Sequence, residues 1–150
     1  MEYVSNGGCA RPRGASVRIV GVREASAKGG PSQFLDVSKG LVSAADAAAI
    51  DQKARQAQAK IGAKAFVVAV RADEDVESYR PLYKELGMDG RDLLVVFNDA
   101  QRHLHTQALS KKIGNEILAA TKTLFYSESR TAGVMQMLDE VVIRLNSKVP

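Results

Sequence analysis

Carboxylate and amide side chains follow two apolar runs, and their spacing is the clearest indication of chemistry in this chain. The first run spans Ala65 to Val70 and the second spans Leu93 to Phe97. Ligands of open α/β sheets collect where neighbouring parallel strands end, and oxygen ligands suit Ca²⁺ or Mg²⁺. The predicted metal ligands that follow the two runs are Asp73, Asp75, Asn98 and Asp99. Asp89 and Asp92, from the loop before the second run, are predicted to join them.

These residues also have a purely structural interpretation. Asp and Asn side chains hydrogen-bond nearby backbone groups in turns and helix caps. A cation at this position would polarise a phosphoryl oxygen and activate water, as in a metal-dependent phosphatase. The sequence leaves both alternatives open.

Two histidines, His103 and His105, alternate with Leu104 and are therefore expected on one face of a strand. A zinc pair would need a third protein ligand, and no further Cys or His lies nearby in the sequence. Solvent-facing strand residues, or a local pH sensor, are the favoured interpretation.

No set of residues predicts covalent catalysis. Ser110, Ser127 and Ser129 lack the G-x-S-x-G setting of a nucleophile, and no glycine-rich loop matches a phosphate or dinucleotide motif. The single cysteine, Cys9, excludes an internal disulfide. We therefore assign no catalytic residue and no organic cofactor.

The elements that would position these side chains follow from hydrophobic periodicity. An alanine-rich helix is expected from Ser43 to Ile61, with Gly62 as its stop. The two apolar runs read as buried strands flanking a helix that begins near Ser78, with a right-handed crossover between the strands. A hairpin strand follows around His103 to Ala108, and two amphipathic helices close the chain, the last capped by Thr131.

These elements predict an α/β fold with a three- or four-stranded mixed sheet, containing a βαβ unit and a hairpin strand, and helices packed on both faces. The 150 residues, 45% of them hydrophobic, suit one domain. We expect it to span residues 34–150, after a basic leader at residues 1–33. That leader is expected to be flexible, apart from an edge strand at residues 16–22.

The charge distribution argues against a nucleic-acid partner. The net charge is +4, and residues 1–40 hold six basic and three acidic side chains while the rest hold fifteen and fourteen. Nucleic-acid binders concentrate basic residues on one face with aromatic stacking partners. The first residues lack the apolar run of a signal peptide, and no stretch reaches the roughly 20 apolar residues of a membrane span.

Several short segments occur in an order typical of one family. They are Phe34-Leu35-Asp36, Gly40-Leu41-Val42-Ser43, Gly62-Ala63, Gly87-Met88-Asp89-Gly90 and Leu93-Leu94-Val95-Val96. This succession resembles the TPM domain, a small α/β fold of bacterial envelope proteins and of a chloroplast protein involved in photosystem repair. The resemblance covers roughly two thirds of the chain and suggests an envelope-exposed or organellar compartment.

Two departures bear on function. Family members typically read Asp-Asn-Gly where this chain has Asp89-Gly90-Arg91, and carry a Gly-Tyr-Gly-rich turn with a glutamate where it has Ala108 to Lys112. These departures weaken the metal or phosphatase function that the resemblance implies. We therefore expect a non-catalytic accessory domain that binds a protein partner, either soluble or membrane-associated, or helps a complex assemble. The alternatives are the phosphatase and attachment to anionic surfaces or nucleic acid through the leader.

Overall fold

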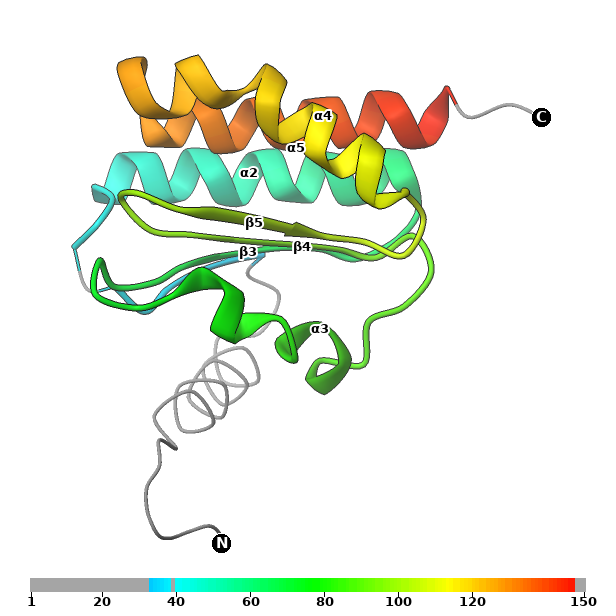
Figure 1. Cartoon of the computed structure of the whole chain (residues 1–150), viewed down its shortest axis with the longest axis horizontal. Coiled ribbons are helices and arrows are strands. Elements are labelled where there is room, and N and C mark those ends of the chain that lie inside the picture. The colour runs from blue at the N-terminus through cyan, green and yellow to red at the C-terminus, as the bar shows by residue number, and fades with distance from the viewer. Residues whose placement is uncertain (1–32, 39, 148–150) are drawn as a thin grey trace, which may run out of the picture.

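A four-stranded mixed sheet forms the centre of the structure, a computed structural model that describes residues 33–38 and 40–147 (Figure 1). Its strands, in spatial order, are β2 (Phe34–Asp36), β3 (Ala65–Ala69), β4 (Leu93–Phe97) and β5 (Arg102–His105). β2, β3 and β4 are parallel, and β5 pairs antiparallel with β4. The predicted α/β class, the βαβ unit and the hairpin strand are confirmed, and the number of strands described is four.

Helices cover both faces of this sheet, as predicted. One layer holds α2 (Ala44–Ile61), α4 (Lys111–Ala120), the π-helical turn η2 (Leu124–Glu128) and α5 (Arg130–Asn146). The 3-10 turn η1 (Val76–Tyr79) and the short helix α3 (Leu82–Glu85) lie on the other face. Figure 1 shows the two layers above and below the sheet.

Alternation along the central strands creates two hydrophobic cores. Val67 and Val95 pack beneath α2 and α5, whereas Val68 and Val96 pack against η1 and α3. All five residues of β3 and of β4 are buried. This explains their continuous apolar sequences, because a strand covered on both faces has no solvent-facing positions.

Helix α2 begins and ends where the sequence predicts. The Ser43 hydroxyl accepts the backbone N–H of Asp46 at 3.1 Å, and Gly62 ends the helix at φ 67°. Only glycine adopts this left-handed conformation without a steric penalty. Ile50, Ala54 and Ile61 form its buried stripe.

The two crossover connections have opposite hands. Both step in the same direction across the sheet, from β2 to β3 and from β3 to β4, yet α2 lies on one face and η1 with α3 on the other. One of them is therefore left-handed, an arrangement that is rare in parallel β-α-β units.

Two local expectations are corrected. The helix expected from Ser78 is divided, because Pro81 has no N–H to donate and the Glu77 carbonyl accepts the Arg80 N–H at 3.1 Å instead. The cap of α5 is Ser129, not Thr131, since the Ser129 hydroxyl accepts the N–H of Ala132 at 3.2 Å.

The edge strand expected at residues 16–22 lies outside the described residues. Within the described residues, no helix is both long and apolar enough to cross a bilayer.

Candidate functional site

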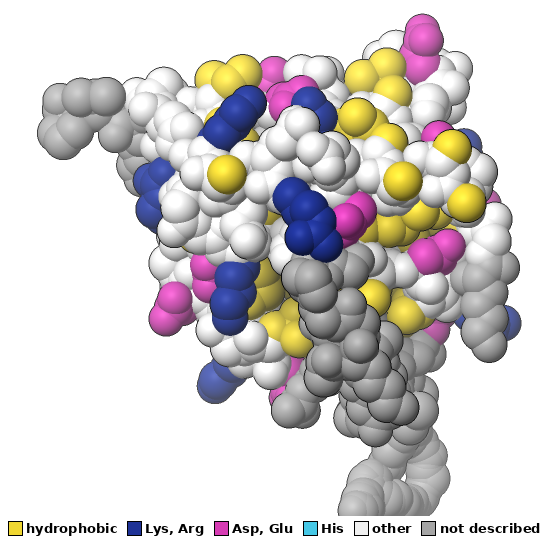
Figure 2. Space-filling model, turned by 180° about the vertical axis from the view of Figure 1, so that it is seen from behind, with side chains coloured by type: hydrophobic (Ala, Val, Ile, Leu, Met, Phe, Trp, Pro, Cys, Tyr) yellow, Lys and Arg dark blue, Asp and Glu magenta, His cyan; other side chains and the backbone are white. Residues whose placement is uncertain are grey.

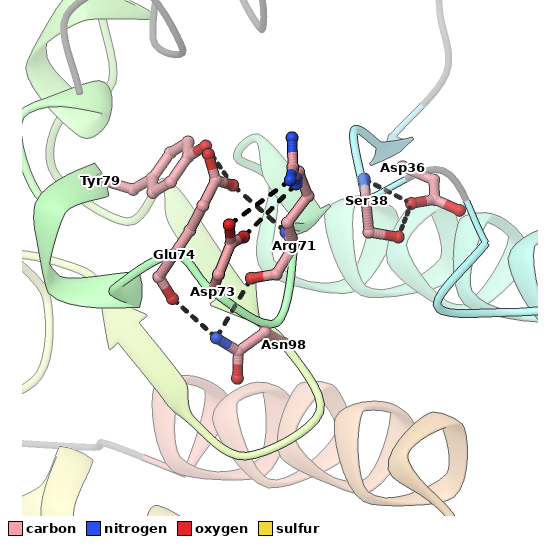
Figure 3. A network of polar contacts seen from close by, with 7 residues as sticks. All are labelled: Asp36, Ser38, Arg71, Asp73, Glu74, Tyr79 and Asn98. Carbon is pink, nitrogen blue, oxygen red and sulfur yellow. Dashed lines mark hydrogen bonds and ion pairs between the residues drawn. The ribbon is translucent and has the colours of Figure 1, made fainter. Parts of the chain in front are cut away.

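Asn98 is almost fully buried at the carboxyl ends of β3 and β4, where the sequence predicts a cation site (Figure 3). Its Nδ2 donates to the carbonyl oxygens of Glu74 at 2.8 Å and Arg71 at 3.4 Å. Its Oδ1 accepts the backbone N–H groups of Ala100 at 2.8 Å and Gln101 at 2.7 Å. Because protein groups occupy both ends of the amide, Asn98 fastens the segment after β3 to the turn between β4 and β5.

The aspartates beside Asn98 contact local partners. Asp73 pairs with Arg71, with Oδ1 and Nε 3.3 Å apart and both side chains exposed. Asp75 caps η1, and its Oδ1 accepts the backbone N–H two residues later at 3.0 Å. Asp99 contacts Arg130 through its backbone carbonyl, 2.6 Å from the guanidinium Nε. These contacts are those of turn and cap residues.

Asp89 and Asp92 lie at the opposite end of the sheet, so the structure separates them from the other four predicted ligands. Asp92 directly precedes β4 and Asn98 directly follows it. Six residues of extended chain separate the two by about 20 Å. The Asp92 carboxylate accepts the N–H groups of Lys64 at 2.8 Å and Asp89 at 3.0 Å, which ties the loop before β4 to the start of β3.

A carboxylate that the sequence did not predict as a ligand, that of Glu74, belongs to the same group of polar contacts in Figure 3. Glu74 Oε1 accepts the Tyr79 hydroxyl at 3.0 Å and the Arg71 N–H at 3.2 Å. In the part of the chain that the structure describes, no three His, Cys, Asp or Glu side chains form a group that could hold a metal ion. Cation binding by Asp73, Asp75 and Asp99 stays a prediction.

A second candidate site lies along β5, the last strand of the described sheet. Residues of β4 alternate in their backbone bonding: Leu93 bonds toward β3, and Asn98 bonds toward Gln101 of the hairpin. The antiparallel register places His103 opposite Val96, and His105 two residues further along. The backbone groups of His103 and His105 therefore point toward β4, and those of Arg102 and Leu104 point outward from the sheet.

This outer edge is the floor of a groove with a volume of about 340 Å³. Pockets that hold ligands measure roughly 300–1,000 Å³. One wall is formed by Glu77 and Arg80 of the η1 segment, and the other by Lys111, Gly114 and Leu118 of α4. A strand edge with outward-pointing backbone groups therefore faces an open groove between two helical walls.

His103 lines this groove with an incomplete set of hydrogen bonds. Its side chain is 9% exposed, and Nδ1 lies 3.3 Å from the Glu77 carboxylate. Nε2 is buried without a hydrogen-bond partner. The ring of His105 lies beside it, 5.9 Å between centroids, and packs on Tyr83 at 4.1 Å.

Burial keeps both imidazoles neutral near pH 7. Loss of solvation lowers the pKa of His103, against the opposing attraction of Glu77. The same effect, with a contribution from His103, lowers the pKa of His105. The Arg80 hydrogen bond holds the pKa of Glu77 below its usual range, so Glu77 stays ionised as an acceptor for the Nδ1 proton of His103. His103 is not a solvent-facing strand residue, which corrects the sequence expectation.

Sequence reasoning did not predict the groove, although it predicted β5, the strand that forms the floor of the groove. The hairpin after β4 was predicted, and an edge position for that strand follows from it. The walls form only because α4 folds back beside β5, and the spacing of Lys111 and Gly114 in the sequence does not predict this position.

The sheet order, the two helical layers and the position of β5 at the end of the described sheet define a small α/β domain with a groove beside β5. The same fold occurs in the N-terminal domain of the cg2496 protein from Corynebacterium glutamicum, with a TM-score of 0.63 and 14% identity over 80% of this chain and 84% of that one. It also occurs in the N-terminal domain of a protein from P. gingivalis, with a TM-score of 0.59 and 15% identity over 82% and 85% of the two chains. No protein-family model matches the sequence, and no curated protein matches it.

Proposed function

We propose that this chain is a non-catalytic, TPM-like accessory domain that binds a protein partner by accepting an extended segment along the outer edge of β5. The observation that carries the proposal is the pair of outward-facing backbone positions, Arg102 and Leu104, on the floor of the groove. An added strand would hydrogen-bond to these positions, and the groove walls would select its side chains. Binding of this kind suits a domain that helps a larger complex assemble.

The phosphatase alternative has less support from the described contacts. It needs carboxylates that converge on a cation. Asp73 and Asp75 instead contact Arg71 and the start of η1, and the oxygen of Asn98 already accepts two N–H groups.

Attachment to nucleic acid also has little support from the surface that is described. On the face seen in Figure 2, Lys and Arg side chains are interspersed with Asp and Glu rather than gathered in one patch. A basic stripe would be needed to follow a phosphate backbone. The basic leader lies outside the described residues.

A variant that fills the groove tests the proposal. Gly114 lies on α4 in the groove wall, and a Cβ atom there meets nothing within 4 Å. Gly114→Gln should therefore leave the fold intact, and stabilise α4 by up to about 1 kcal/mol, because glycine is a poor helix former. Its side chain would occupy the space that a partner segment needs.

The assay is selection of peptides from a random display library on the wild-type domain, followed by titration of the selected peptides. We expect amide shifts centred on Arg102 and Leu104, and at least tenfold weaker binding to Gly114→Gln. The matched control is Ala119→Gln, an exposed position of the same helix outside the groove. Peptides that bind both variants equally, or that shift residues remote from β5, would reject the proposal.

A further inference from the structure

The α4 wall of the β5 groove carries uncompensated positive charge. Helix α4 starts with Lys111 and Lys112 and has no acidic residue in its first turn. Cations are unfavourable at this end of a helix, because the free N–H groups already carry partial positive charge. The helix therefore begins with an electrostatic arrangement that an anion would relieve.

The carboxylate that lines the groove does not supply that anion. Glu77 belongs to the opposite wall, where Oε1 lies 2.8 Å from Arg80 and Oε2 lies 3.3 Å from His103. Arg102, on the α4 side, donates to the Thr121 hydroxyl at 2.7 Å and to a backbone carbonyl at 2.9 Å, both neutral acceptors. Within the described residues, neither Arg102 nor Lys111 pairs with a carboxylate.

The opposite wall offers a different contact. His103 is nine-tenths buried, lines the groove and holds an Nε2 without a hydrogen-bond donor. A neutral imidazole whose Nδ1 proton faces Glu77 presents Nε2 as an acceptor. Because Nε2 is itself buried, a hydroxyl group in the groove would supply the missing donor once the imidazole ring turns toward it.

We infer that the segment accepted by β5 is acidic, with carboxylates at alternate positions facing Lys111 and Arg102, and hydroxyl-bearing residues at the positions between. This inference rests on the proposed strand addition. Successive side chains of an added strand point to opposite faces of the sheet. One set therefore meets the α4 wall, and the other set meets the wall that contains His103.

Three blocked hexapeptides test this chemistry. They alternate threonine with glutamate, with glutamine or with lysine, and each is titrated into the ¹⁵N-labelled full chain at low salt. We expect shifts at Arg102 and Leu104, with the glutamate peptide binding about tenfold more tightly than the glutamine peptide, as two partly exposed charge pairs would give. The lysine peptide should bind most weakly, and added salt should reduce the differences.

Charge reversal in the groove wall should invert the order. Lys111→Glu should favour the lysine peptide, and its new carboxylate suits the first turn of α4, so the fold should persist. Lys122→Glu makes the same change of net charge outside the groove and should leave the glutamate preference unchanged.

Other outcomes separate this inference from the proposed function. Equal binding of all three peptides at β5 would overturn the acidic preference and leave strand addition standing. The acidic preference would also be overturned, and strand addition would stand, if peptides selected from the library bind at β5 but the glutamate peptide does not. A concentration-dependent dimer that Gly114→Gln abolishes would overturn the inference by identifying a second copy as the occupant.

Discussion

His103 has one ring nitrogen facing a carboxylate and the other buried without a partner. An unsatisfied buried acceptor lowers stability, since it has lost its hydrogen bond to water. Such a group is retained at a cost, and in the wall of a groove that cost is explained if a bound segment completes its hydrogen bonding. A change at His103 should therefore affect both the stability of the domain and the proposed binding.

The protonation of His103 should make the domain less stable in mild acid. Its folded-state pKa lies below the value of 6.5 for a free histidine, mainly because of burial. The unfolded chain therefore binds a proton more readily, so the free energy of unfolding falls as pH decreases below 6.5. We expect the urea midpoint of the wild type to fall more between pH 7.5 and pH 5.5 than that of His103→Gln. Identical pH dependence, or an NMR titration midpoint above 6.5, would contradict this.

Asn98 offers a test between a structural and a metal-binding role. Asn98→Ala removes a donor to two carbonyl groups and an acceptor of two N–H groups, and should cost about 2 kcal/mol of unfolding free energy. The cost should be the same with Ca²⁺, Mg²⁺ or a chelator. Asp99→Ala, next to it, should change stability by less than about 0.5 kcal/mol. A loss at Asn98 that appears only with added cation would support the metal site instead.

At the scale of elements, α5 packs closely on the turn η2. A Cβ atom at Gly133 would lie 2.5 Å from Cα and 2.6 Å from Cβ of Phe125. The ring of Phe125 meets Phe97 of β4 edge to face, with centroids 6.2 Å apart. The π-helical turn thus places an aromatic ring in the core by bringing its backbone against a glycine.

Two glycine-to-alanine changes should therefore have opposite signs. Gly133→Ala should destabilise the domain by about 1–3 kcal/mol, because the backbone of Phe125 would have to move. Gly114→Ala should stabilise it by up to about 1 kcal/mol, since that position is open and alanine favours helix. Chemical denaturation of both variants measures the difference, and equal effects would show that η2 does not pack on α5 as described.

At the scale of the whole molecule, the described hydrophobic clusters contain residues from Phe34 to Leu145. We expect residues 34–146 to fold without the first 30. Deleting Met1 to Gly30 should keep thermal unfolding cooperative and shift its midpoint by only a few degrees, because neither cluster loses a described member. Loss of cooperativity would mean that residues 16–22 form an integral strand.

The sequence predicted those parts of the fold that depend on local patterns. The runs that became β3 and β4 are apolar throughout because both faces are covered, and Ser43 and Gly62 bound α2 through backbone chemistry that short segments encode. The departure Asp89-Gly90-Arg91 also has a structural role, since Arg91 donates to the Ile61 carbonyl at the end of α2. That contact spans thirty residues and has no local pattern.

The candidate site was predicted less well for the same reason. Residues after strand ends indicated where side chains could meet, but not that local N–H groups would occupy Asp75 and Asn98. The groove depends on the position of α4 beside β5, which is set by packing across the whole domain. Periodicity identifies a helix and its buried face. It does not show that the exposed side of α4 forms the wall of a groove.

Amide hydrogen exchange along β5 tests strand addition most directly. In the free chain, the amides of His103 and His105 should exchange slowly, because they point toward β4, whereas those of Arg102 and Leu104 should exchange fast. A bound peptide from the library selection should slow exchange at Arg102 and Leu104 in proportion to its occupancy. Gly114→Gln should prevent this. Unchanged exchange at Arg102 and Leu104 when a selected peptide is bound would contradict the account.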